Sequence, residues 1–366
     1  MKKIVLTLLF IVLLASPCFA ISDGEQQSLF GVEKLEDAVP RDAQEVMGKT
    51  RVDTNSAGIS EALHSVVSQF EQRLLDELRS CGKGAASVLL IVILCSVMSA
   101  LFDYDKTPEY ITLAGCLGIT AVAANGVRSL VGMGAGAINE LSDFSKVLLP
   151  TLCTAAVSGG AVTSAPVKYA ATAMFMDVLI SVSKDFIVPL IYAYLVTVVC
   201  GAAVGGKALK SASKLIKWLC VTFMTVMTMA FTAYLGISGA VSGSADAVAT
   251  KVTKTAISAA LPVVGGIISD AASSVVAGAG ILRSAIGAFG MISVCGICVA
   301  PVAALGAQFL LYKAAAACAA AMPSGRLSEL IDGIGDACGI MLGLTGCAAV
   351  MLFVSIISSA RAVTGL

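Results

Sequence analysis

Charged residues are scarce in this chain. Asp, Glu, Lys and Arg make up only 13% of its 366 residues, about half of their usual share in soluble proteins, while 57% are of hydrophobic types. A chain with so few charges cannot expose most of its surface to water, which argues against a soluble enzyme. The 24 basic residues are balanced by 24 acidic ones, so the positive excess expected of a nucleic-acid-binding protein is missing as well. The composition predicts a polytopic membrane protein that contacts the lipid bilayer and has no nucleic-acid partner.

The chain also lacks the side chains from which most catalytic and metal sites are built. Its single histidine, His64, lies in a polar segment, so neither a histidine-based triad nor a Cys/His zinc site can be assembled. The 12 cysteines are spread through apolar runs, where a thiol behaves as a small hydrophobic side chain. Cys295 and Cys298 have redox spacing, but they lie inside a long apolar stretch rather than beside a βαβ unit. We therefore expect no enzyme, no metal site and no cofactor.

The N-terminus has the layout of a secretory signal peptide followed by a polar region. Lys2 and Lys3 precede the apolar run 4–14, and Ala20 is a small residue suited to cleavage. Half of the 24 acidic residues of the chain then fall between positions 21 and 83. We expect 1–20 to be a signal peptide and 21–84 to be a polar extracytoplasmic region.

Within that region, apolar residues recur every three or four positions, as on one face of a helix. They are Ile59, Leu63, Val66, Val67, Phe70, Leu74, Leu75 and Leu78. The pattern predicts an amphipathic helix over 59–79. This helix lies either on the membrane surface or the rest of the protein, or it docks another protein, with Phe70 and Leu74 as candidate interface residues.

Residues 85–366 carry long apolar runs that predict a multi-pass membrane domain. About 20 apolar residues cross the hydrocarbon as a helix, which is the general solution in lipid for a chain without barrel-like alternation. The candidate spans are 85–102, 110–127, 147–165, 186–205, 218–236, 285–312 and 339–359, with 169–184 as a shorter one. Residues 261–282 are apolar but rich in Gly and Ser, which favours a broken or re-entrant element beside other protein. The predicted fold is an all-α bundle of about seven to nine membrane segments.

A lysine-rich connection predicts the orientation of this domain. Lys207, Lys210, Lys214 and Lys217 fall within eleven residues that contain no acid, and the positive-inside rule places them in the cytoplasm. An extracytoplasmic N-terminus followed by five spans reaches that side, which supports counting 169–184 as a span.

Glycines at four-residue spacing mark helix faces that can approach closely. The clearest stripe is Gly335, Gly339 and Gly343, continued by Cys347. It indicates packing either within one bundle or between subunits, so a homo-oligomer is one alternative.

A weak internal repeat has an offset of 112 residues, with chance similarity as the alternative explanation. It pairs Pro150 with Pro262 and Pro189 with Pro301, and a Gly-Gly pair follows the first proline of each copy. Duplicated, Gly/Pro-interrupted segments are typical of midplane sites in transporters. An acid at membrane depth there is a functional candidate, unless it lies near an interface or bonds a neighbouring helix. The candidate functional residues are Asp177, Asp270, Pro262, Gly265, Gly266, Gly159 and Gly160.

Several motifs in the membrane region resemble the stage III sporulation protein AE family. They are 157–160 (VSGG), 261–270 (LPVVGGIISD), 277–282 (AGAGIL), 285–290 (AIGAFG), 310–313 (LLYK), 326–335 (RLSELIDGIG) and 353–359 (FVSIISS). The similarity covers roughly 85–366, and the polar region carries no motif of the family. The resemblance implies a mother-cell membrane protein of endospore-forming bacteria, in the membrane surrounding the forespore. It also implies that other stage III sporulation membrane proteins are its partners in a transenvelope complex that sustains late forespore gene expression.

Three classes of function therefore stay open. The leading hypothesis is a structural or channel-forming subunit of the sporulation complex. A secondary transporter or permease for a small solute is the alternative, supported by the repeat and by Asp177 and Asp270. An intramembrane enzyme comes third, because no catalytic constellation is visible.

Overall fold

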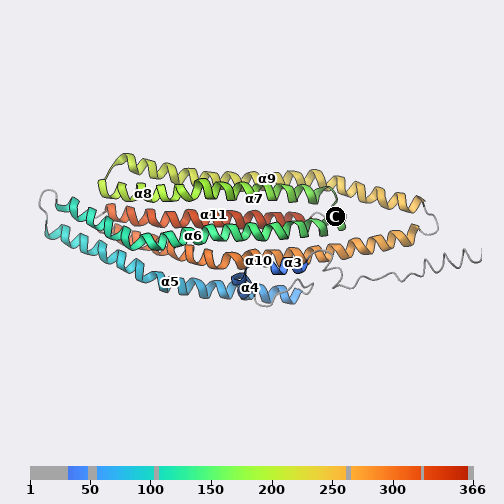
Figure 1. Cartoon of the computed structure of the whole chain (residues 1–366), viewed down its shortest axis with the longest axis horizontal. Coiled ribbons are helices and arrows are strands. Elements are labelled where there is room, and N and C mark those ends of the chain that lie inside the picture. The colour runs from blue at the N-terminus through green and yellow to red at the C-terminus, as the bar shows by residue number, and fades with distance from the viewer. Residues whose placement is uncertain (1–31, 48–55, 103–106, 261–264, 323–324, 362–366) are drawn as a thin grey trace, which may run out of the picture.

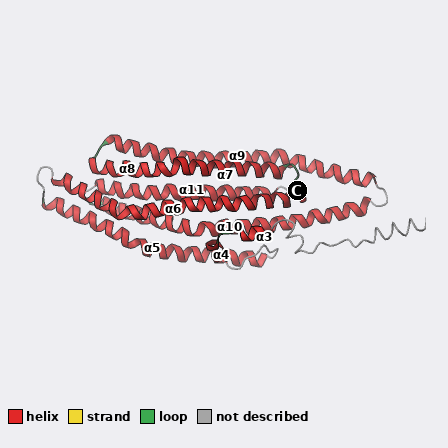
Figure 2. Ribbon diagram, viewed as in Figure 1, coloured by secondary structure: helices red, strands yellow, loops and turns green. Residues whose placement is uncertain are grey.

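The computed structural model describes residues 32–47, 56–102, 107–260, 265–322 and 325–361. Within these ranges, side chains are described except at 56–60, 125, 239–279 and 360–361. The predicted signal peptide, 1–20, lies outside the described residues. All regular elements in the described ranges are helices, as Figure 2 shows, which confirms the all-α prediction.

The polar N-terminal region forms α3 (Val32–Asp37), α4 (Arg41–Met47) and the first half of α5 (Ser56–Leu101). The later elements are α6 (Thr107–Ser158), α7 (Ser164–Val182), the π-helix η1 (Ser183–Ile187), α8 (Val188–Val204), α9 (Lys207–Ala260), α10 (Gly265–Ala320) and α11 (Gly325–Arg361). The predicted amphipathic helix 59–79 is part of α5, which runs without a break into the predicted span 85–102.

Several predicted membrane segments merge into longer helices. The segment 110–127 and most of 147–165 lie in α6, with Pro150 inside that helix. Likewise, 169–184 and 186–205 lie on one rod, because η1 joins α7 to α8 directly. A helix continues through a few charged residues, such as those between the two apolar runs of α6, unless its backbone hydrogen bonding is interrupted. Hydropathy alone therefore separated runs that the backbone joins.

Six helices in the described residues are long and apolar enough to cross a membrane, in place of the seven to nine expected. They are Glu61–Leu101, Thr107–Ser158, Ser164–Val204, Lys207–Ser238, Gly280–Ala320 and Gly325–Ser359. Residues 265–282, expected to be a broken or re-entrant element, instead form the continuous beginning of α10, because backbone hydrogen bonds carry the helix through its glycines. The multi-pass architecture is thus supported, while the predicted count and the re-entrant element are not confirmed.

The long helices run side by side along the long axis of an elongated bundle (Figure 1). The last turns of α5, α8 and α10 lie toward one end, at the left of Figure 1, together with the first turns of α6, α9 and α11. The ends of α6 and α11 and the start of α7 lie toward the other end. Three helical rods now precede the lysine-rich start of α9 instead of five spans. Both numbers are odd, so an extracytoplasmic N-terminus still brings these lysines to the cytoplasmic side, which stays a prediction.

Helices α10 and α11 form the centre of the bundle. In their most apolar windows 67% and 61% of residues are buried, against 11% in α5. Large apolar side chains on α5, including Leu90, Leu94 and Leu101, are exposed instead, as expected of a helix that faces lipid.

The N-terminal region packs onto this centre. A Cβ added at Gly296 of α10 would lie 3.1 Å from Met47 Cγ and 3.3 Å from the carbonyl oxygen of Ala43, so α4 rests directly on α10. The hydroxyl of Ser65 in α5 donates to the Val46 carbonyl at 2.8 Å, which ties α4 to α5. The polar region is therefore integrated into the bundle.

Candidate functional site

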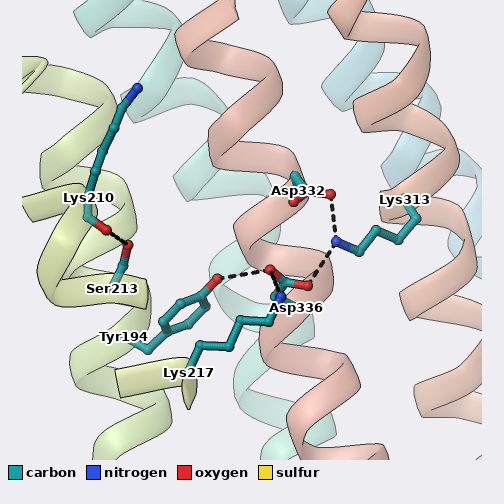
Figure 3. Close-up of polar contacts among 7 residues, drawn as sticks. All are labelled: Tyr194, Lys210, Ser213, Lys217, Lys313, Asp332 and Asp336. Carbon is teal, nitrogen blue, oxygen red and sulfur yellow. Dashed lines mark hydrogen bonds and ion pairs between the residues drawn. The ribbon is translucent and has the colours of Figure 1, made fainter. Parts of the chain in front are cut away.

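A cluster of charged residues joins four helices near the lysine-rich end of the bundle (Figure 3). The Asp336 carboxylate on α11 accepts hydrogen bonds from Lys217 Nζ of α9 at 2.6 Å and from Lys313 Nζ of α10 at 2.8 Å. The Tyr194 hydroxyl of α8 donates to the same carboxylate at 3.3 Å, and Lys313 also pairs with Asp332 at 2.6 Å. We call Tyr194, Lys217, Lys313, Asp332 and Asp336 the charged cluster.

Burial differs sharply among the members of the charged cluster. The side chain of Asp336 is only 13% exposed, while those of Lys313, Lys217 and Asp332 are 31%, 44% and 48% exposed. A carboxylate removed from water is stable only when its oxygens receive charge-assisted hydrogen bonds, and Asp336 receives two of these and a third from a phenol. Asp336 is therefore the centre of the cluster, and its partners depend on it.

The small residues of α11 explain how these groups meet. A Cβ at Gly333 would lie 2.5 Å from Val198 Cγ1, so only glycine lets α8 approach closely enough for Tyr194 to reach Asp336. A Cβ at Gly335 would lie 3.2 Å from Tyr312 Cβ, which indicates a close, though less tight, approach of α10 beside Lys313. Asp332 and Asp336 are four residues apart and thus share one helical face.

The predicted glycine stripe packs inside the bundle. Gly339 faces the Phe309 ring of α10, where a Cβ would be 3.1 Å away, and Gly343 faces Met224 of α9 at 3.4 Å. With Gly335, these residues make contacts within one chain, which is the first of the two alternatives considered from the sequence. A role at a subunit interface stays a prediction.

A cavity of about 540 Å³ opens beside the charged cluster between α8, α9 and α11. Its wall carries three lysines of α9 and three acids of α11, namely Lys210, Lys214, Lys217, Glu329, Asp332 and Asp336. Lys210 and Glu329 form an outer ion pair at 2.6 Å, with both side chains about half exposed. The volume falls in the range of small-molecule sites, and the mixed charges suit water or a small charged solute. Among the described residues, no group of three or more His, Cys, Asp and Glu could hold a metal ion.

The acids predicted to be functional lie elsewhere. Asp177 is exposed on α7, close enough to Lys146 of α6 to interact electrostatically with it. Asp270 lies in α10, in a stretch whose side chains are outside the description, and Pro262 lies outside the described residues. The charged cluster contains neither acid.

The predicted glycines take different places. Gly265 and Gly266 are the first residues of α10. Gly159 and Gly160 form the turn from α6 to α7, where Gly160 has φ of 95°, a conformation that suits glycine. A Cβ at Gly159 would lie 4.0 Å from the Gly280 nitrogen, so this turn approaches α10.

The predicted interface residues of α5 face the bundle in part. Phe70 packs against the main hydrophobic core, and Leu74 is half-buried. The exposed apolar side chains of the same stretch include Leu63 and Val67, at 51% and 59% exposure. The helix therefore has one face on the rest of the protein, and a second face that other proteins can reach.

The charged cluster was missed from the sequence, although two quoted motifs contain parts of it. Lys313 ends the motif 310–313, and Asp332 lies within 326–335. The four-residue spacing of Asp332 and Asp336, at the start of a long helix that is mostly apolar, was the available signal. The pairing of Asp336 with Lys217, 119 positions away, depends on how α9 and α11 align in space.

Comparison with known proteins places these features in a family. The sequence model of stage III sporulation protein AE matches residues 47–362, which include the whole charged cluster. The stage III sporulation protein AE of Bacillus subtilis (strain 168) is 20% identical over 288 residues, covering 77% of this chain and 72% of the relative. No solved structure matches the chain. Because the family model matches most of its length, the chain belongs to the stage III sporulation protein AE family.

Proposed function

We propose that this protein is a membrane subunit of a transenvelope complex between mother cell and forespore, with a structural or channel-forming role. It works from the mother-cell membrane around the forespore and is needed for late forespore development. The observation that carries the proposal is the family match over 47–362, which spans all the apolar helices from α6 to α11. The proposal assigns the protein no catalytic step.

Charges on the outer surface support an assembly role. Asp143 and Lys146 of α6 form an ion pair at 2.8 Å with side chains 74% and 64% exposed, and Asp177 of α7 is exposed nearby. All three lie on helices that are long and apolar enough to cross a membrane. A charge that faces hydrocarbon is costly, so three charges on the outer surface of α6 and α7 favour contact with another membrane protein. Other stage III sporulation membrane proteins are the proposed partners, and a second copy of this chain is the alternative occupant.

Affinity purification from sporulating cells tests the proposal. We expect the tagged protein to retain other stage III membrane proteins, and Asp177→Leu combined with Lys146→Leu to lose them while membrane insertion stays normal. Arg79→Leu is the matched control, because Arg79 on α5 is 81% exposed and lies in the polar half of its helix. A deletion strain should complete engulfment but fail to maintain late forespore gene expression. Recovery of the protein alone, together with normal spores from the deletion strain, would overturn the proposal.

A small-solute permease is the second candidate, and the cavity beside the charged cluster is the observation that favours it. A permease predicts flux through proteoliposomes that contain this protein alone, and loss of that flux in Asp336→Asn. Co-purification with partners and no flux in the isolated protein would favour the complex subunit.

A further inference from the structure

Arg283 of α10 is buried without a partner. Its side chain is 2% exposed, and Nε, Nη1 and Nη2 have no hydrogen-bond acceptor in the described structure. The ion pairs found among the described residues do not include it either. Arginine keeps its proton under all ordinary conditions, so burial cannot be relieved by losing the charge. A buried guanidinium therefore requires an anion from outside the described contacts.

Arg283 lies inside one end of the bundle, where α6 turns into α7. One helical turn further along α10, a Cβ at Gly287 would lie 3.6 Å from Ile356 of α11. One turn earlier, Gly280 approaches Gly159 in the α6–α7 turn. Ile281, which is 60% exposed, takes the outward face of the same helix turn. Arg283 thus points inward, at the level at which two candidate spans end.

A second cation is buried at the same end. Lys168 of α7 is 4% exposed, and its Nζ donates to the carbonyl oxygen of Ser358 in the last turn of α11 at 2.7 Å. One turn deeper, the hydroxyls of Thr172 and Ser355 share a hydrogen bond of 2.8 Å. The three helices α7, α10 and α11 therefore bring two positive charges to one end of the bundle.

We propose that Arg283 anchors a binding site for a phosphate group at this end, with Lys168 as the second cation. The planar guanidinium offers paired N–H donors that match a phosphate, and turns between spans lie at the depth of lipid head groups. The phosphate comes from an anionic lipid head group or from free phosphate. Because the guanidinium nitrogens are covered, binding requires the helices around Arg283 to separate locally. The site is independent of the proposed sporulation role.

Melting temperatures of purified protein test the site, because the difference between Arg283→Met and the wild type should change sign when an anionic lipid is added. In neutral detergent and phosphate-free buffer, Arg283→Met should raise the melting temperature, because it removes an unpaired buried charge and keeps an unbranched side chain. Added phosphatidylglycerol should then raise the melting temperature of the wild type but not of Arg283→Met, so that their order reverses. Phosphatidylethanolamine, which carries no net charge, should shift the wild type less. Arg128→Met is the matched control: Arg128 is exposed on α6, and this variant should respond as the wild type does.

Two further arms identify the source of the phosphate. Native mass spectrometry should show phosphatidylglycerol binding about ten-fold weaker in Arg283→Met, as expected for the loss of a charge-assisted hydrogen-bonded contact. A melting-temperature shift with inorganic phosphate alone would identify free phosphate, and a shift with the lipid only would identify the head group. If Arg283→Met cannot be purified as a folded protein, Arg283→Lys is the second variant. It keeps the positive charge but lacks the paired N–H donors of the guanidinium, so it should bind the lipid more weakly than the wild type.

Specific outcomes would overturn the proposal. A lower melting temperature of Arg283→Met in phosphate-free detergent would mean that the guanidinium already has a partner within the chain. An unchanged response of Arg283→Met or Arg283→Lys to phosphatidylglycerol would place any phosphate elsewhere. No response of the wild type to either phosphate source, with a co-purifying protein that Arg283→Met loses, would assign the site to a carboxylate of another subunit. These assays use isolated protein, so a negative result for the phosphate site does not contradict the proposed function. A negative result for the sporulation complex likewise does not contradict the phosphate site.

Discussion

Each end of the α10–α11 pair removes a cation of α10 partly or wholly from water, but only one of the two cations has hydrogen-bond acceptors among the described residues. At one end, Lys313 of α10 is held between Asp332 and Asp336 of α11 at 2.6 and 2.8 Å. Toward the other end, Arg283 of α10 has no acceptor in the described structure although its side chain is more deeply buried. A cation that is paired with two carboxylates holds its helices together, whereas a cation without an acceptor is free to bind an anion from elsewhere. The comparison indicates a structural role for the first end and a receptive role for the second.

The largest expected effect comes from breaking the paired end. Asp336→Leu removes an acceptor shared by Lys217, Lys313 and Tyr194, which leaves Lys313 with Asp332 alone and Lys217 without its carboxylate partner. We expect a loss of about 3 kcal/mol in the free energy of unfolding, at the low end for a broken buried pair because both lysines keep some contact with water. Denaturation in mixed micelles measures it. Equal stability of variant and wild type would show that the lysines find other acceptors and that this end is not fixed by Asp336.

Gly333→Ala should weaken the same end by about 2 kcal/mol through packing alone. The new Cβ would lie 2.5 Å from Val198 Cγ1, so α8 must move and carry Tyr194 away from Asp336. The second substitution Val198→Ala should restore part of the loss. Gly346→Ala on the same helix is the control, because a Cβ there meets no atom within 4 Å, and it should leave stability unchanged or slightly raised. A loss in the control as large as in Gly333→Ala would contradict the packing argument.

At the opposite end, Thr172→Val should cost about 1 kcal/mol. It deprives the buried Ser355 hydroxyl of its partner at 2.8 Å with little change in shape. The double variant Thr172→Val with Ser355→Ala should be closer to the wild type, because no hydroxyl is left unpaired. Thermal unfolding of the four proteins gives the coupling. Additive losses would mean that this hydrogen bond contributes nothing to how α7 is held on α11.

The smallest effect is expected for the outer ion pair of Lys210 and Glu329. Both side chains are about half exposed, so water and salt screen their interaction and Lys210→Ala should change stability by less than about 1 kcal/mol. Any effect should fade further at high ionic strength. A salt-independent loss as large as that of Asp336→Leu would erase the distinction between the outer pair and the charged cluster.

Sequence reasoning reached the helical class and the apolar regions but not the helix boundaries. The 52 residues of α6 include two apolar runs with Arg128, Glu140 and Lys146 between them. Hydropathy marks where a chain prefers lipid, whereas a helix ends only where its backbone hydrogen bonds stop. For the same reason, hydropathy divided the continuous rod of α7 and α8 into two predicted spans.

The candidate site was harder to foresee because its contacts join distant parts of the chain. The four-residue spacing of Asp332 and Asp336 is visible in the sequence, and so is the lysine-rich start of α9. What brings them together is the relative alignment of α8, α9, α10 and α11, which depends on close contacts at Gly333 and Gly335. Asp177 was singled out because it is an acid in an apolar run, yet the helix turns it outward, where it can serve contact with other proteins.

The length of α6 has a consequence for the contacts it can make. Its 52 residues span about 78 Å as a continuous helix, more than twice the hydrocarbon thickness of about 30 Å. Both α10 and α11 pack against this helix. Since about 20 residues suffice to cross the hydrocarbon, a large part of α6 is left for contacts outside it, and these contacts share one continuous helix with the crossing segment.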